Sequence, residues 1–237
     1  YVDTDAGPIA TRWLVNAAGH GADVLDRALG HDRFHVVPRK GELIVFDKLS
    51  RGLVDHIVLP VPSSRGKGVL VSPTIYGNVM LGPTSQNIED RRDTSTTEDG
   101  LAFLLEKGRA LMPVLLEEEV TTTYAGLRAA TEHDDYVVAV HPDQRYLLLG
   151  GIRSTGLTAS LAIAEHAAGL LRGVGLDLTP RGALPPTPRM PNVGEAFLRP
   201  YAAAERIAAG PEYGRIVCFC ERATRGELRD AFASTIP

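Results

Sequence analysis

The sequence predicts an α+β fold, with a mixed, largely antiparallel sheet and helices on one face. Strand-forming residues concentrate in short runs near residues 39–46, 69–81, 121–128 and 136–140, as is typical of strands. Among these runs, residues 98–112 repeat apolar side chains at the helical period. This pattern indicates a helix that packs one face on the sheet.

Size, charge and cysteine content narrow the class of protein. The 237 residues suffice for one large domain or two modest ones. Lys and Arg number 25 against 29 Asp and Glu, a formal net charge of −4, whereas a nucleic-acid binder needs a concentrated basic face. No apolar run reaches the roughly 20 residues that cross a bilayer, and two cysteines are too few for a disulfide framework. We therefore expect a cytoplasmic protein that binds no nucleic acid, with peripheral attachment to the inner membrane left open.

The first elements are a strand, a tight turn of small residues and a helix. The strand is predicted over residues 11–15 and the helix over 22–29, which Gly30 closes. Small side chains let the backbone approach another group, and a helix start offers N–H groups to an anion. Ordinary strand–helix packing explains this turn better when it is taken alone. Its residues are Asn16, Ala17, Ala18 and Gly19.

The middle of the chain predicts a hairpin followed by the amphipathic helix. Residues 69–81 have the pattern of a hairpin with its turn at 76–78. Thr97 is placed to cap the helix over 98–112, and acidic residues follow it where the helix dipole favours them. Pro113 is expected to end or kink that helix.

A second strand, near residues 146–149, leads through a glycine-containing loop into an almost wholly apolar helix over 157–171. Because this helix has hardly any polar face, we expect it to be among the most buried elements. The N–H groups at its start could stabilise partial negative charge on a bound ring carbonyl, although a structural role explains the loop equally well. The loop and helix start comprise Gly151, Ile152, Arg153, Ser154, Thr155, Gly156, Leu157 and Thr158.

Basic side chains provide candidates for anion binding. Arg128 lies in YAGLRAAT, a segment of small and apolar residues, so it either pairs with a buried acid or faces a cavity for an anionic ligand. Arg39 and Lys40 stand at the entrance of a strand and could clamp an anion, although such a pair is more often solvated. His133 is interpreted as a surface-loop residue, and no Ser, His and Asp pattern marks a nucleophile elbow.

The last part of the chain begins with five prolines between Pro180 and Pro191, a composition that predicts an extended linker. Beyond it, Cys218 and Cys220 have the spacing of two thiolates that share one metal or one iron of a cluster. On spacing alone, two structural thiols are the simpler interpretation, because a closed site needs four ligands. A capping-box pattern at 224–227 predicts that a helix follows.

Six segments within about residues 1–175 are specific in combination. They are WLVNAAG (13–19), PRKGELIVFDK (38–48), GKGVLVSPTIYGNVMLGPTS (66–85), DTSTTEDGL (93–101), YAGLRAA (124–130) and GGIRSTGLTASLAIAEHAAGLL (150–171). Together they resemble the C-terminal part of flavoproteins of the glycerol-3-phosphate dehydrogenase and D-amino-acid oxidase-like superfamily, and they also resemble L-2-hydroxyglutarate oxidase. The tail VCFCERATRGEL (217–228) is similar to the start of the small [2Fe-2S] domain appended to such dehydrogenases, whose pattern needs a second cysteine pair.

The resemblance implies how the chain is divided. Residues 1–30 would be a remnant of the FAD-binding domain, 31–145 the substrate-binding domain, 146–176 a strand and helix that return to the FAD-binding domain, 177–214 a Pro-rich linker and extension, and 215–237 the start of a BFD-like [2Fe-2S] domain. With Tyr1 in place of an initiator Met and no GxGxxG motif, we expect a fragment that lacks the dinucleotide-binding βαβ unit. Such a fragment should by itself hold FAD only weakly.

The resemblance also implies an activity, that of an FAD-dependent oxidoreductase acting on a small anionic 2-hydroxy or amino compound. Glycerol 3-phosphate is the first expectation, and L-2-hydroxyglutarate or an amino acid is the alternative. The turn at 16–19 would lie near the dinucleotide part of FAD and residues 151–158 at its ring, where Thr155 replaces a usual proline. Arg128, with Lys40 as a second cation, would bind the substrate anion.

Two further expectations concern the iron–sulfur cluster and the partners. By the resemblance, Cys218 and Cys220 would be ligands of a [2Fe-2S] cluster, and an electron acceptor or partner subunit would take the electrons. A hypothesis from another class is a non-catalytic module that binds a partner subunit or carries an electron-transfer cluster. Flavin content distinguishes the two hypotheses, because only the enzyme requires flavin.

Overall fold

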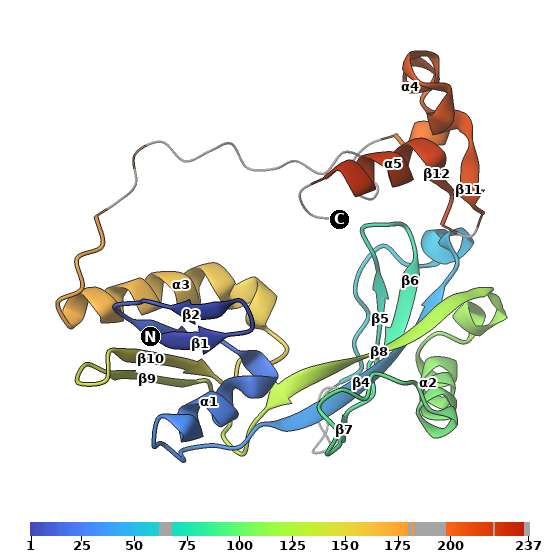
Figure 1. Ribbon diagram of the computed structural model, residues 1–237. Helices are drawn as coiled ribbons and strands as arrows, with labels where there is room; N and C mark the ends of the chain where they lie inside the picture. The colour runs from blue at the N-terminus through green and yellow to red at the C-terminus, as the bar shows by residue number, and fades with distance from the viewer. Residues whose placement is uncertain (62–67, 180–181, 183–197, 220, 235–237) are drawn as a thin grey trace. The chain divides into compact units, whose positions relative to one another are not determined.

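The computed structural model describes residues 1–61, 68–179, 182, 198–219 and 221–234. The chain forms two compact units (Figure 1). The first comprises Tyr1–Lys40, Gln86–Asp93 and Gly126–Leu184, and the second comprises Gly41–Ser85, Thr94–Ala125 and Pro185–Pro237. Two long strands, β4 (Val37–Phe46) and β8 (Val120–Ala130), each contribute residues to both units. The predicted linker falls almost entirely outside the described residues, as does Cys220.

The first unit is built on a sheet in the order β3-β10-β9. These strands are β3 (Leu14–Asn16), β10 (Tyr146–Gly150) and β9 (Val137–His141). Strand β10 runs parallel to β3 and antiparallel to β9. Every residue of β10 is buried, because alternate side chains enter cores on the two faces of the sheet.

Two helices follow these strands. Helix α1 (Ala22–Ala28) comes after β3 and the short 3-10 helix η1 (Gly19–Gly21), and it contributes Ala22 to the core that contains Tyr146. Helix α3 (Gly156–Gly173) comes after β10 and packs on the other face of the sheet. A separate antiparallel pair, β1 (Val2–Thr4) and β2 (Gly7–Ile9), lies at the N-terminus.

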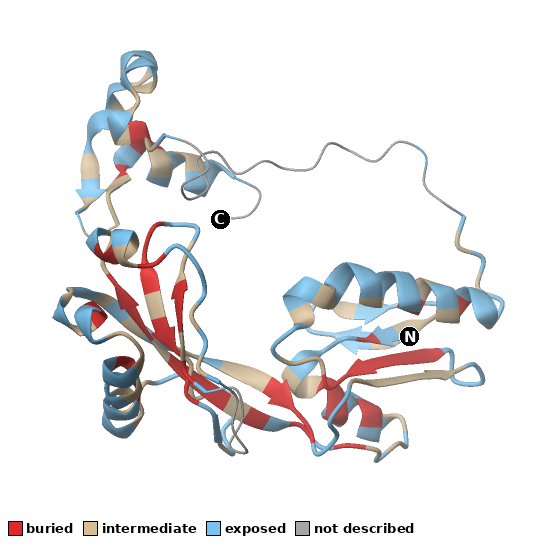
Figure 2. Ribbon diagram, turned by 180° about the vertical axis from the view of Figure 1, so that it is seen from behind, coloured by how far each residue is buried: buried red, intermediate tan, exposed pale blue. Residues whose placement is uncertain are grey.

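Helix α3 corrects the prediction that it would be among the most buried elements. Only Ala167 and Leu171 are buried, against Leu147 and Leu149 of β10, whereas Leu157 is 93% exposed. The exposed colour along α3 in Figure 2 shows the same pattern. Apolar composition indicates that a helix can be covered on several sides, but the described residues cover this helix on one side only.

The other main sheet has the order β5-β6-β4-β7, with β8 also paired to β4. The shorter strands are β5 (Leu70–Pro73), β6 (Val79–Gly82) and β7 (Gln86–Asn87). Strand β4 is antiparallel to β6 and β7, and β5 is antiparallel to β6. This confirms the α+β class and the predicted hairpin. The strand predicted at 136–140 is instead β9 of the first unit, because a short turn pairs it with β10.

Helix α2 (Glu98–Leu111) packs on this sheet as predicted, with Leu104 in a core that also contains Ile44 and Leu81. The short 3-10 helices η2 (Lys48–Leu53) and η3 (Pro113–Glu117) flank this core. Thr97 caps α2, since its hydroxyl accepts a hydrogen bond from the Gly100 N–H. The helix ends before Pro113, which cannot donate a backbone hydrogen bond.

A buried carboxylate supports the start of α2. Glu42 of β4 is 1% exposed and accepts hydrogen bonds from the N–H of Thr97 at 2.6 Å and from its hydroxyl at 2.9 Å. The hydroxyl of Thr84 donates a third at 3.1 Å. A negative charge is stabilised at this end of a helix, where N–H groups and the helix dipole point toward it.

The C-terminal elements of the second unit are short. They are η4 (Pro200–Ala202), α4 (Ala204–Ala209), η5 (Pro211–Gly214), β11 (Ile216–Cys218), β12 (Ala223–Thr224) and α5 (Arg225–Ala233). The predicted capping box is confirmed: Thr224 and Glu227 exchange side-chain and backbone hydrogen bonds at the start of α5. Among the described residues, no helix combines the length and apolar character needed to cross a bilayer.

Candidate functional site

The two segments predicted to flank a cofactor emerge at one edge of the first unit's sheet. Strand β10 is parallel to β3, with Leu148 opposite Asn16, so the turns that follow both strands leave the sheet at the same end. Ligands of open α/β sheets bind at this carboxyl edge. Ala17, Ala18 and Gly19 are exposed there, as are Ser154 and Thr155 of the second loop.

Glycine is required at one position in each turn. Gly19 has a φ of +54° and Gly151 a φ of +67°, a left-handed conformation that most side chains disfavour. A Cβ added to Gly19 would meet no atom within 4 Å. The backbone of this turn is therefore open to close approach by a ligand.

The side chain of Asn16 is fully used inside the protein. It is 1% exposed, and its amide donates to the Ala22 carbonyl at 2.8 Å and to the Tyr146 hydroxyl at 2.9 Å. Its carbonyl oxygen accepts from the Ala18 N–H at 3.2 Å. Asn16 thus shapes the turn from within, and Ala17, Ala18 and Gly19 provide the exposed backbone.

The start of α3 presents backbone donors. Thr155 makes no side-chain cap, and its hydroxyl is hydrogen-bonded to the Tyr136 hydroxyl. The Gly156 N–H donates to the Arg153 carbonyl at 2.9 Å, but no acceptor in the described part of the chain reaches the N–H groups of Leu157 and Thr158. Such groups at a long helix's start favour a partially negative partner.

Two loop residues of the predicted set have local roles. Arg153 donates from its guanidinium to the Asp134 carbonyl and so ties the loop to the turn before β9. Ile152 packs against the core beneath α3.

Arg128, on β8, is half-buried. Burial lowers its pKa, and the positive charge of Arg39 lowers it further. Arg39 is fixed by a hydrogen bond from its Nε to Asn87 Oδ1 at 2.9 Å. Two guanidinium charges thus act on one region of the first unit, an arrangement that favours an anion between them.

Lys40 lies beside Arg39 in sequence but has a different environment. It is 3% exposed, and its ammonium forms an ion pair with Asp93 at 3.0 Å. Adjacent residues of a strand point to opposite faces, which explains the difference. The sequence proposed Lys40 as the second cation, whereas in the structure Arg39 is the cation whose charge reaches Arg128.

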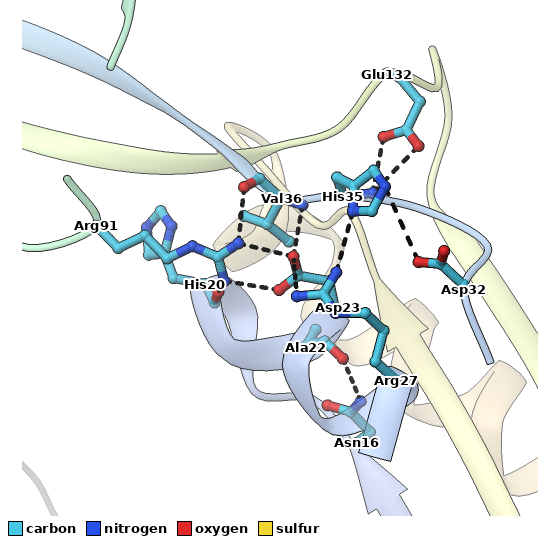
Figure 3. A network of polar contacts seen from close by, with 10 residues as sticks. All are labelled: Asn16, His20, Ala22, Asp23, Arg27, Asp32, His35, Val36, Arg91 and Glu132. Carbon is cyan, nitrogen blue, oxygen red and sulfur yellow. Dashed lines mark hydrogen bonds and ion pairs between the residues drawn. The ribbon is translucent and has the colours of Figure 1, made fainter. Parts of the chain in front are cut away.

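A polar network that sequence reasoning missed holds the segment after the first turn (Figure 3). Asp23 is 1% exposed and binds the Arg91 guanidinium through both oxygens, each at 2.7 Å. Arg91 also donates to the carbonyls of His20 and Val36. Burial acts to raise the pKa of Asp23, but hydrogen bonds from Arg91 and the Val36 N–H, with the charges of Arg91 and Arg27, outweigh it and lower the pKa to about 2.

This lowered pKa predicts acid-sensitive stability. A carboxyl with a depressed folded-state pKa stabilises the fold above its unfolded value of 3.8, and the contribution of about 2 kcal/mol is lost as the pH falls toward 2. We expect the difference in free energy of unfolding between wild type and Asp23→Asn to shrink between pH 5 and pH 2. Denaturant unfolding at a series of pH values measures it. A difference that stays constant over this range would show that Asp23 does not carry the charge described.

Comparison with known proteins gives the family. The family model described as FAD dependent oxidoreductase matches residues 1–170. Glycerol 3-phosphate dehydrogenase from Caloramator mitchellensis is 32% identical over 223 residues, which are 93% of this chain and 46% of that protein. Glycerol 3-phosphate oxidase from Mycoplasma pneumoniae is 34% identical over 161 residues, 67% of this chain and 42% of that protein. The chain thus spans less than half the length of these relatives.

Solved structures agree with this assignment. Dithionite-reduced L-alpha-glycerophosphate oxidase from Mycoplasma pneumoniae with FAD bound is similar with a TM-score of 0.59 and 34% identity, covering 67% of this chain and 42% of that one. Glycine oxidase from Bacillus cereus has a TM-score of 0.63 at 20% identity, covering 73% of this chain and 46% of that one, which supports the fold alone. The chain therefore belongs to the family of FAD dependent oxidoreductases.

Proposed function

We propose that the protein containing this chain uses FAD to oxidise a small anionic 2-hydroxy compound, with glycerol 3-phosphate as the first candidate. The observation that carries this proposal is that two exposed, glycine-containing turns meet at the carboxyl edge of neighbouring parallel strands. Sequence identity of 32–34% to glycerol 3-phosphate dehydrogenase and oxidases supports the substrate. The mitochondrial L-2-hydroxyglutarate dehydrogenase of Arabidopsis thaliana, 29% identical over 176 residues, supports the alternative.

The residues present fit FAD. The open backbone at Gly19 can lie against the dinucleotide part, and the N–H groups of Leu157 and Thr158 are donors for a ring that becomes electron-rich. Exposed Leu157 adds an apolar contact for a flat ring. FAD, when bound, supplies the oxidant that takes two electrons from the substrate C–H bond.

Arg128 is proposed to hold the substrate anion. Its half-buried guanidinium attracts a phosphate or carboxylate more strongly than an exposed one would, because less water screens the charges. Arg39 adds a second positive charge in the same region. Lys40 is held by Asp93, so a direct contact between Lys40 and the substrate requires that this ion pair opens. In this assignment β3, β10 and α3 belong to the cofactor side and the sheet around β4 to the substrate side.

A substrate panel tests the proposal. The protein containing this chain, purified with its flavin, is mixed under anaerobic conditions with glycerol 3-phosphate, L-2-hydroxyglutarate or glycine, and flavin absorbance is followed. We expect fast bleaching by glycerol 3-phosphate. Bleaching by L-2-hydroxyglutarate alone would assign the alternative substrate, and a purified protein without flavin would contradict an FAD enzyme.

We also propose that Cys218 and Cys220 ligate a [2Fe-2S] cluster that passes electrons onward. The two-residue spacing and the capped helix α5 that follows support this. In the described part of the chain no group of three or more His, Cys, Asp or Glu side chains gathers for a metal, so this chain alone should bind essentially no iron. One subunit of the anaerobic glycerol-3-phosphate dehydrogenase of Escherichia coli is 26% identical over 157 residues, and this similarity supports an electron acceptor on a partner subunit.

A further inference from the structure

His20 connects the two parts of the candidate site. It lies in η1, directly after the turn at 16–19, and its Nε2 is 3.1 Å from the carbonyl oxygen of Leu127. Leu127 immediately precedes Arg128 on β8. One imidazole therefore bridges the turn on the cofactor side and the strand that carries the anion-binding arginine.

The chemistry of this contact fixes the protonation of the ring. A carbonyl oxygen only accepts, so Nε2 must carry the proton and donate it. In the neutral tautomer Nδ1 is then an acceptor, and Nδ1 of His20 is buried without a hydrogen-bond partner among the described residues. A buried polar atom without a partner costs stability. The imidazole is therefore retained for the bond that Nε2 makes.

The other end of His20 is also held. Its backbone carbonyl accepts a hydrogen bond from Arg91, which the bidentate contact with Asp23 and the bond to the Val36 carbonyl fix in place (Figure 3). With the main chain anchored by Arg91 and the ring anchored on Leu127, His20 has little freedom. The separation between the turn and this part of β8 is thereby fixed.

We infer that His20 is a positioning residue that sets the separation between the cofactor-side turn and Arg128. The inference rests on the proposed function, because it takes Arg128 as the anion-binding group. Displacement of a bound substrate by about 1 Å from its reacting partner can lower a rate roughly 100-fold. Loss of the Nε2 bond should therefore lower kcat more than it raises KM, since the guanidinium remains but its place changes.

Three variants test this inference in the protein that contains the chain. His20→Ala removes the bond, and His20→Gln keeps an N–H donor that can reach the Leu127 carbonyl. His133→Ala is the matched control, because His133 Nε2 makes the same kind of bond, at 3.0 Å to the Arg33 carbonyl, in an exposed loop of the same unit. We expect His20→Ala to lower kcat roughly 10- to 100-fold with a small change in KM. His20→Gln should recover most of this loss, and His133→Ala should lose little.

A second measurement does not depend on activity. Hydrogen–deuterium exchange of peptides covering residues 124–130 should be faster in His20→Ala than in the wild type and His20→Gln. Unchanged exchange together with unchanged kcat would overturn the inference while leaving the proposed function intact. Equal losses of kcat in His20→Ala and His133→Ala would also overturn it, because they would indicate a general effect on stability. A wild type that does not oxidise glycerol 3-phosphate would count against the proposed function, and the exchange result would still decide the connection.

Discussion

Replacing Arg128 with alanine is expected to lower kcat/KM for glycerol 3-phosphate roughly 100- to 1000-fold while FAD stays bound. The reason is that a half-buried guanidinium makes charge-assisted hydrogen bonds to a phosphate, and removal of such a partner costs about 3–4 kcal/mol. Steady-state kinetics and the flavin absorbance of the purified variant measure the two parts of this prediction.

Two other substitutions control for charge and fold. Arg128→Lys keeps the charge but not the planar fork, so it should recover only part of the lost activity. Arg172→Ala removes an exposed arginine of α3 and should leave kcat/KM unchanged. If Arg128→Ala instead emptied the protein of flavin, and the reconstituted enzyme turned over normally, Arg128 would be a structural residue.

Gly100→Ala is expected to lower the free energy of unfolding by about 3 kcal/mol, although alanine favours a helix by roughly 1 kcal/mol over glycine. A Cβ at this position would lie 1.7 Å from Glu42 Oε2. The carboxylate would have to move, and it would lose hydrogen bonds from Thr97 that are worth about 1.5–3 kcal/mol each. Denaturant unfolding measures the change.

The matched control is Gly169→Ala in α3, where an added Cβ meets nothing within 4 Å. There the helix propensity acts alone, and the variant should gain about 0.5–1 kcal/mol. The prediction for Gly100 fails if both alanine variants stabilise the protein, because Glu42 would then have been free to move aside.

Local sequence signals predicted the elements and their ends well. Thr97 and Thr224 cap helices through bonds to residues within one turn, so a short window of sequence contains both partners. The same holds for the hairpin of β5 and β6, whose turn lies between its strands.

Long-range contacts were beyond such signals. Asp23 and Arg91 are 68 positions apart, and neither has a neighbour in sequence that marks the pair. The sequence predicted that Arg39 and Lys40 point to opposite faces only if the strand was known, and which face is buried depends on Asp93, 53 positions from Lys40. The burial of α3 depended on what packs against it, which composition does not specify.

The order of strands in the first unit has a consequence for synthesis of the chain. Strand β3 pairs with β10, and the bond from Asn16 to the Tyr146 hydroxyl joins residues 130 positions apart. At about 5–20 residues per second, a ribosome needs on the order of ten seconds to make the intervening chain. The core of the second unit, from Ile44 to Leu115, is complete before β10 is made. The edge that carries both turns is therefore assembled late, and until then β3 is an unpaired strand that chaperones can bind.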